Sequence, residues 1–344
     1  MLLVILGAGA SADSLSPSRD DRWRPPLARE LFDDRFHDLL RRHPGAVVLA
    51  ERVRTGVARG ESLEQVLYRM RGDETDPRRP GQILDLQFYL QRLLWECGAR
   101  WGALDAGMSN YLTLLGDIEE WRVKTRMRVA FVTFNYDTLL EASLTRRFGW
   151  LFHSLDDYVR DEYLVLKVHG SASWMQVTDL VTQEGAGVTR ERLIEKAASL
   201  KRRDEFIVAG PGTTQYALNG VVPAIAIPAE PKAMFACPVA HITALKGFLP
   251  EIERVLCIGW RGADRSLLEL MAGQVREGIE ATLVTRPPTS SQGAPLDSAV
   301  VDCRKEGDTT WVADSGFTGP CRVVRTGFSG FVRSHLPEFL ATLT

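Results

Sequence analysis

The feature that most constrains this chain is a short, wholly apolar run at its start, followed at once by a glycine-rich turn. Leu2–Leu6 carries no polar residue, which is typical of a central parallel strand covered on both faces. The next residues, Gly7-Ala-Gly-Ala-Ser-Ala12, fit the G-x-G-x-x-A pattern of a nucleotide-binding turn. In such a turn glycines permit the tight bend and the close approach of a pyrophosphate, and free N–H groups face the anion. The pattern therefore predicts phosphate binding by Gly7, Ala8, Gly9, Ala10 and Ser11. The alternative is a turn of small residues needed only for packing.

Similar apolar runs recur along the chain and alternate with helical patterns. They predict further strands at Val129–Thr133, Leu164–Val168, Val255–Ile258, Ala281–Thr285 and Cys321–Arg325. A long helical block, with a capping box at Ser62 and Gln65, separates the first strand from the second. This order predicts an α/β fold: a doubly wound parallel, Rossmann-like sheet with a helical lobe inserted after the first strand.

The domain organisation follows from the same pattern. We expect residues 1–344 to form a single domain, with residues 26–121 as the inserted lobe. A helical stripe is predicted over Leu27–Leu40, and irregular loops are expected in the glycine-rich and proline-rich segments 176–235 and 293–318.

Composition narrows the class of protein. The 344 residues carry a net charge of −2, 45% are hydrophobic and 25% are charged, which is typical of a globular protein and gives no strong signal for nucleic acid or a membrane surface. No run approaches the ~18 apolar residues of a membrane span. Leu2–Leu6 is shorter than the ~7–15 apolar residues of a signal peptide, so we expect a cytoplasmic protein. The five cysteines form no CxxC pair, which argues against a zinc site or a disulfide framework and predicts no bound metal.

Polar residues follow two of the predicted strands. Thr133, Asn135 and Asp137 alternate after one strand, and His169 ends the next and precedes a glycine. Ligands bind at the carboxyl ends of strands in such sheets, so these residues are candidate site residues. Helix capping by Asn135 or Asp137, and a structural histidine, are the alternatives.

A dehydrogenase is disfavoured. Such an enzyme needs a second strand that ends in an acid about 20 residues after the glycine turn. The acids available there are Glu30, Asp33 and Asp34, and they lie inside the predicted helical stripe.

Together the three motifs resemble the sirtuin signature. Gly7-Ala-Gly-Ala-Ser11, Thr133-Phe-Asn-Tyr-Asp137 and the His169-Gly170 pair are similar to the family's G-A-G-x-S, T-x-N-x-D and H-G, in the same order. The likeness extends to Gly259 after a later strand and to Thr285, both implied to contact the nucleotide. Asp13 stands where the family's cofactor loop begins. Asp264 is similar to an acid that follows the later glycine turn, and the alternative for it is a helix N-cap.

Two departures refine the resemblance. Protein-deacylating sirtuins carry a zinc module with two CxxC pairs, which this chain lacks, and their G-I-P-D-F-R loop is replaced after Asp13. The chain is more similar to divergent bacterial sirtuin-like proteins of anti-phage defence. That resemblance implies an NAD hydrolase releasing nicotinamide and ADP-ribose, with NAD as substrate and no metal. A non-catalytic NAD or ADP-ribose sensor and, less favoured, a protein deacylase are the alternatives.

The resemblance also implies roles and partners. Asn135 would orient the ribose or the attacking water, Asp137 would fix Asn135 or a ribose hydroxyl, and His169 would act as general base. Thr133 is expected among the cofactor-binding residues. A homo-oligomer is expected, and the separate regulatory partner implied is a hexameric translocase ATPase or an Argonaute-like protein.

Overall fold

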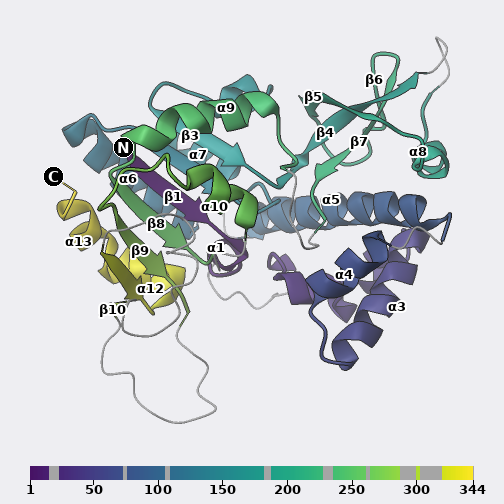
Figure 1. Cartoon of the computed structure of the whole chain (residues 1–344), viewed down its shortest axis with the longest axis horizontal. Coiled ribbons are helices and arrows are strands. Elements are labelled where there is room, and N and C mark those ends of the chain that lie inside the picture. The colour runs from purple at the N-terminus through teal and green to yellow at the C-terminus, as the bar shows by residue number, and fades with distance from the viewer. Residues whose placement is uncertain are drawn as a thin grey trace.

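The computed structural model of the chain describes residues 1–14, 23–72, 76–104, 109–181, 187–227, 235–260, 264–286, 300–302 and 320–343. A seven-stranded sheet lies in the left half of the molecule in Figure 1. Its strands are β1 (Leu2–Leu6), β2 (Val129–Thr133), β3 (Tyr163–Lys167), β8 (Arg254–Ile258), β9 (Glu280–Val284), β10 (Val300–Asp302) and β11 (Cys321–Val324). They lie in the order β10-β11-β9-β8-β1-β2-β3, and all neighbours pair in parallel except β10 with β11. The predicted parallel sheet is confirmed, and each predicted strand agrees with an observed one to within about a residue at either end.

Helices cover both faces of this sheet, as expected for a doubly wound fold. One face packs against α6 (Asn110–Thr125), α7 (Leu139–Phe148), α12 (Gly327–Ser334) and α13 (Leu336–Ala341). The other packs against α9 (Val239–Phe248), the 3-10 turn Leu249–Glu251 and α10 (Arg265–Met271). Successive residues of β1 alternate between the two cores, because neighbouring side chains of a strand point to opposite faces. This arrangement explains why the strand has no polar residue.

The helices inserted after β1 form a lobe with its own core. After the short α1 (Ala8–Ala12), the chain continues through α2 (His37–Leu40), α3 (Pro44–Ala58), α4 (Leu63–Arg71) and the long α5 (Arg79–Leu104). In Figure 1, α3 and α4 lie below α5 and away from the large sheet. The capping box of Ser62 and Gln65 begins α4 as predicted. The continuous helix predicted over Leu27–Leu40 is wrong, since that segment forms the 3-10 turns Ala28–Glu30 and Asp34–Phe36 before α2.

A second, antiparallel sheet occupies much of a segment expected to be irregular. It contains β4 (Gly170–Val181), β5 (Arg202–Val208), β6 (Gln215–Tyr216) and β7 (Asn219–Ile225), in the order β5-β4-β7-β6. This sheet packs with α8 (Arg190–Lys196) against α5. The loops predicted for 176–235 are therefore wrong over these strands. Glycines, Pro223 within β7 and irregular register along β4 hide the usual alternation of a strand.

The remaining expectations from the sequence concern the segment 293–318, the cysteines, membrane-spanning helices and the bounds of the lobe. The expected loop 293–318 lies outside the described residues, apart from β10. Among the described cysteines, Cys97, Cys237 and Cys257 are free and buried, but Cys321 is disulfide-bonded, which sequence spacing did not predict. No helix within the described ranges is long and apolar enough to span a bilayer. The bounds 26–121 for the lobe remain a proposal.

Candidate functional site

Five strands end side by side at one edge of the large sheet, and the sequence motifs converge there. In the order β9-β8-β1-β2-β3, the strand ends lead into Thr285, Gly259, Gly7, Thr133–Asn135 and His169. Parallel strands place their carboxyl ends at the same edge, so motifs more than 200 residues apart become neighbours. This edge is the candidate functional site.

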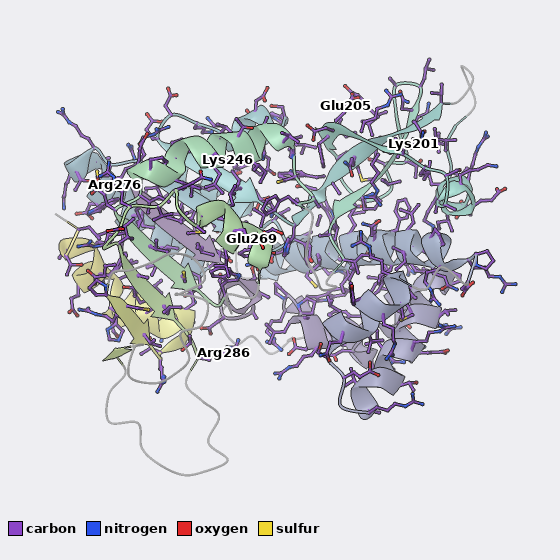
Figure 2. All side chains as sticks on the ribbon, viewed as in Figure 1. Lys201, Glu205, Lys246, Glu269, Arg276 and Arg286 are labelled. Atoms are coloured by element: carbon purple, nitrogen blue, oxygen red, sulfur yellow. The ribbon has the colours of Figure 1, made fainter. Side chains whose placement is uncertain are left out.

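Polar side chains are buried at this edge. Charged side chains such as Lys246 on α9 and Arg276 after α10 are exposed at the outside of the molecule (Figure 2). By contrast, Asn135 is 6% and His169 3% exposed. A buried polar group needs a hydrogen-bonding partner or a function that explains it.

The glycines of the first turn pack directly against Gly259 at the end of β8. A Cβ atom on Gly7 would lie 2.4 Å from the Gly259 carbonyl oxygen, and one on Gly9 would lie 2.9 Å from Gly259 Cα. Gly259 has a φ of 63°, and a Cβ there would lie 2.3 Å from the Ala10 nitrogen. Packing alone therefore requires these glycines. Phosphate binding by Gly7–Ser11 stays a prediction, with Ala8 the exposed residue of the turn.

The Asn135 amide is fixed against this turn. Its Nδ2 lies within hydrogen-bond distance of the Gly7 carbonyl oxygen (2.9 Å), Ser11 Oγ (2.9 Å) and Tyr111 Oη (3.2 Å), and its two hydrogens are shared among these three acceptors. A carbonyl only accepts, so Gly7 determines which end of the amide faces the turn. The other end, Oδ1, is buried and has no donor within reach among the described residues. An unsatisfied buried acceptor costs about 1–3 kcal/mol, so Oδ1 is suited to accept from a ligand or a water.

Tyr111 is a site residue that the sequence did not identify. It lies in the first turn of α6, and its Oη is 3.0 Å from Ser11 Oγ. Burial first, and the negative charge of Asp137 second, raise the pKa of Tyr111, so the phenol stays neutral. In the sequence Tyr111 begins the apolar stripe of a helix, and nothing in that pattern separates it from a core residue.

Thr133 and Asp137 shape the turn that carries Asn135. Thr133 Oγ1 accepts from the Asn135 N–H at 3.0 Å, and Asp137 Oδ1 accepts from the Leu139 N–H at 3.1 Å at the start of α7. Lys167 donates to the Asp137 carbonyl oxygen and pairs with Glu141 at 2.9 Å. The Asp137 side chain therefore forms an Asx-type turn just before α7, whose N-cap is Thr138, and the catalytic role of Asp137 stays a prediction.

His169 pairs with an acid from the connection between β8 and α10. Its Nε2 lies 2.8 Å from Asp264 Oδ2, and both side chains are buried. Asp264 Oδ1 accepts from the Leu267 N–H at 2.9 Å and so caps α10. The N-cap that the sequence offered for Asp264 is confirmed, and the contact with His169 is a second role that the sequence did not predict. An acid on one ring nitrogen sets the tautomer and orientation of an imidazole.

Aromatic rings enclose this imidazole. The Phe134 ring meets His169 edge-on with centroids 4.9 Å apart, and Tyr136 lies 6.2 Å away on a nearly parallel plane. Phe134 in turn stacks on Trp260 at 5.1 Å. These rings shield His169 from bulk water.

Asp13 and Thr285 connect the site to the C-terminal helices. Asp13 Oδ2 accepts from the N–H groups of Phe328 (2.6 Å) and Ser329 (3.3 Å) at the start of α12. The Thr285 carbonyl accepts from the Gly327 N–H at 2.8 Å. These are bonds within the protein, and cofactor contacts by Asp13, Thr285 and Gly259 stay predictions. Within the described part of the chain, no group of three or more metal-ligating side chains is found, so metal independence also stays a prediction.

Comparison with known proteins gives similarity to solved structures alone. No protein-family model and no curated protein matches the chain. It is similar to a Sir2 homologue in complex with NAD (TM-score 0.39, 10% identity, 99% of this chain and 90% of that chain). It is also similar to Sir2 with a p53 peptide and NAD⁺ (TM-score 0.40, 15% identity, 100% of this chain and 94% of that chain). A third similar structure is Sir2 with the inhibitor EX-527, 2′-O-acetyl-ADP-ribose and a deacetylated p53 peptide (TM-score 0.39, 14% identity, 98% of this chain and 94% of that chain). TM-scores below 0.5 carry no conclusion about activity, so the proposals below rest on the residues of this chain.

Proposed function

We propose that the chain is an NAD glycohydrolase, which cleaves the bond between ribose C1′ and nicotinamide to give nicotinamide and ADP-ribose. The observation that carries this proposal is the Asn135 amide, held through Nδ2 by three acceptors that share its two hydrogens, with Oδ1 left buried and unsatisfied. Phosphate binding alone needs no such acceptor. A ribose hydroxyl or an attacking water supplies the donor that Oδ1 lacks.

Hydrolysis of this bond requires one water molecule and one base. Water adds its oxygen to C1′ as the C1′–N bond breaks, and the bonding electron pair neutralises the positive nicotinamide ring, which leaves uncharged. The transition state resembles an oxocarbenium ion, as in glycoside hydrolysis. One proton, lost by the water, must be accepted, so one base near C1′ is sufficient.

His169 is the residue suited to accept that proton. With Nε2–H donating to Asp264 Oδ2 at 2.8 Å, Nδ1 carries the lone pair that takes the proton. The Asp264 carboxylate then stabilises the imidazolium that forms, as in other Asp–His pairs. Phe134 and Trp260 limit bulk water at this position, which strengthens such electrostatic effects.

The nucleotide end of the substrate would lie across the glycine turn. The pyrophosphate would face Ala8 and Gly9, and the adenosine side would lie toward Gly259 and Thr285. Asn135 and His169 are both buried, so substrate binding requires the residues that cover them to move.

One incubation separates the candidate functions. The full chain is incubated with NAD, and free nicotinamide and ADP-ribose are measured by chromatography, with ADP-ribose binding measured in parallel by calorimetry. Stoichiometric release of both products supports the hydrolase, whereas binding without turnover indicates a sensor. Turnover that needs an acylated peptide indicates a deacylase. His153→Ala, at an exposed histidine after α7, is the matched control and should behave as wild type.

We also propose a biological role on the motif resemblance: an NAD-depleting effector of bacterial anti-phage defence, active as a homo-oligomer or with a separate partner protein. Expression in bacteria challenged with phage, with NAD measured during infection, tests this role. Unchanged NAD levels in cells that contain the active enzyme and its partner genes would contradict it.

A further inference from the structure

We propose that Tyr111 is a positioning residue, which holds the Asn135 amide so that Oδ1 faces the ligand. This inference rests on the proposed function of the Asn135 site and adds a residue from α6, an element that carries none of the sequence motifs. Tyr111 acts through Asn135 and Ser11, not through contact with the reacting atoms.

Three buried side chains form a closed triangle of hydrogen-bond contacts. Tyr111 Oη lies 3.0 Å from Ser11 Oγ and accepts from Asn135 Nδ2 at 3.2 Å, while Ser11 Oγ accepts from the same nitrogen at 2.9 Å. The three side chains come from α6, α1 and the end of β2, and all are at least nine-tenths buried. A side-chain amide held at several points keeps its orientation when substrate arrives.

Counting hydrogens shows that the triangle is incomplete without a ligand. Only one hydroxyl hydrogen can lie between Ser11 Oγ and Tyr111 Oη, because the two hydroxyl groups cannot donate to each other at once. The other hydroxyl hydrogen has no acceptor among the described residues, and Oδ1 of the same Asn135 amide has no donor among them. A spare donor and a spare acceptor together complement a hydroxyl group, which both accepts and donates.

The Tyr111 ring also packs against α12. The Phe328 ring of α12 packs edge-on against the Tyr111 ring with centroids 5.4 Å apart. Phe328 also donates its backbone N–H to Asp13, two residues after Ser11. The orientation of Asn135 therefore depends on a helix near the C-terminus, which the motifs alone do not suggest.

A double-mutant cycle tests the inference. Nicotinamide release from NAD is measured for wild type, Tyr111→Phe, Asn135→Ala and the double variant. Tyr111→Phe removes one oxygen from a ring that stays packed, and we expect kcat to fall about tenfold with KM changed less than about threefold, as for one lost hydrogen bond. In the Asn135→Ala background the same change should have no further effect, because the group it positions is gone. Tyr89→Phe is the matched control: that buried phenol donates to the Leu31 carbonyl in the lobe and takes no part in the triangle, and kcat should be unchanged.

The outcomes separate this inference from the proposed function. Equal effects of Tyr111→Phe in both backgrounds, or a wild-type kcat for Tyr111→Phe, would overturn the positioning role while leaving hydrolysis intact. A wild-type chain that binds ADP-ribose but releases no nicotinamide, alone and in assembled form or with its partner, would end the hydrolase proposal. The cycle is then measured on the ADP-ribose Kd, where non-additive effects would support the role of Tyr111 and additive effects would refute it.

Discussion

Replacing Asp264 with asparagine separates the catalytic role of this residue from its structural one. In the structure Oδ1 caps α10 through the Leu267 N–H, and Oδ2 contacts His169 Nε2. Asparagine is as good an N-cap as aspartate, so the cap survives. The amide loses the negative charge and, where its nitrogen faces His169, forces Nε2 to accept instead of donate. The proton then moves to Nδ1, the nitrogen proposed to act as base.

The size of the effect follows from the contact that is lost. A buried hydrogen bond to a charged group contributes about 1.5–3 kcal/mol, which is roughly 10–150-fold in rate. Complete loss of a general base costs ~10²–10⁴-fold. We therefore expect kcat for nicotinamide release to fall about 100-fold in Asp264→Asn, with the free energy of unfolding changed by less than about 1 kcal/mol because the cap remains.

The assay compares three variants by nicotinamide release and urea unfolding. Asp264→Ala loses the cap as well, so it should be less stable than Asp264→Asn by about 0.5–2 kcal/mol. Asp157→Asn is the matched control, since that carboxylate accepts from the N–H groups of His153 and Ser154 away from the site, and cleavage should be unchanged. A folded Asp264→Asn protein with kcat within about threefold of wild type would refute the role of the pair.

Three further predictions concern packing and buried titratable groups. Gly9→Val should lower the thermal midpoint as well as abolish NAD binding, because a side chain there overlaps the Gly259 backbone; lost binding at an unchanged midpoint would contradict the packing argument. Burial raises the pKa of the Cys97 and Cys237 thiols to about 12, so both should react with a thiol reagent at pH 8 only after unfolding, and rapid labelling of folded protein would count against this. Burial lowers the pKa of His241 in the folded protein below its ordinary 6.5. As the pH falls through 6.5, the unfolded chain therefore binds more protons than the folded protein, and the free energy of unfolding decreases. His241→Gln should reduce the difference between urea midpoints at pH 7.5 and 5.5, and an undiminished difference would exclude this residue as its source.

The large sheet could be predicted because its strands are buried on both faces. A strand such as Leu2–Leu6 must then be wholly apolar, and this is visible as a run of sequence letters. The smaller sheet could not, because its strands contain proline and bulges and β5 begins with exposed charged residues. Its alternation depends on packing against α5, which no local pattern encodes.

The candidate site divides in the same way. Asn135 and His169 were found because polar residues at the ends of apolar strands stand out in the sequence. Tyr111 contacts Ser11, and Asp264 contacts His169, although about 100 residues separate the members of each pair. Local sequence around Tyr111 shows only a core aromatic residue, and local sequence around Asp264 does not show its contact with His169. Sequence patterns identify where strands end, whereas the side chains that orient the site come from helices and turns placed by the fold.

The central claim is that Asn135 and His169 cleave NAD, and one measurement tests it most directly. Nicotinamide release is followed for the full chain, in the assembled form or with its partner where the isolated chain is inactive, and for the variant with both residues changed to alanine. We predict release by wild type and a loss of at least ~10²-fold in the double variant, whose circular dichroism spectrum should match that of wild type. Wild-type cleavage by a folded double variant would contradict it.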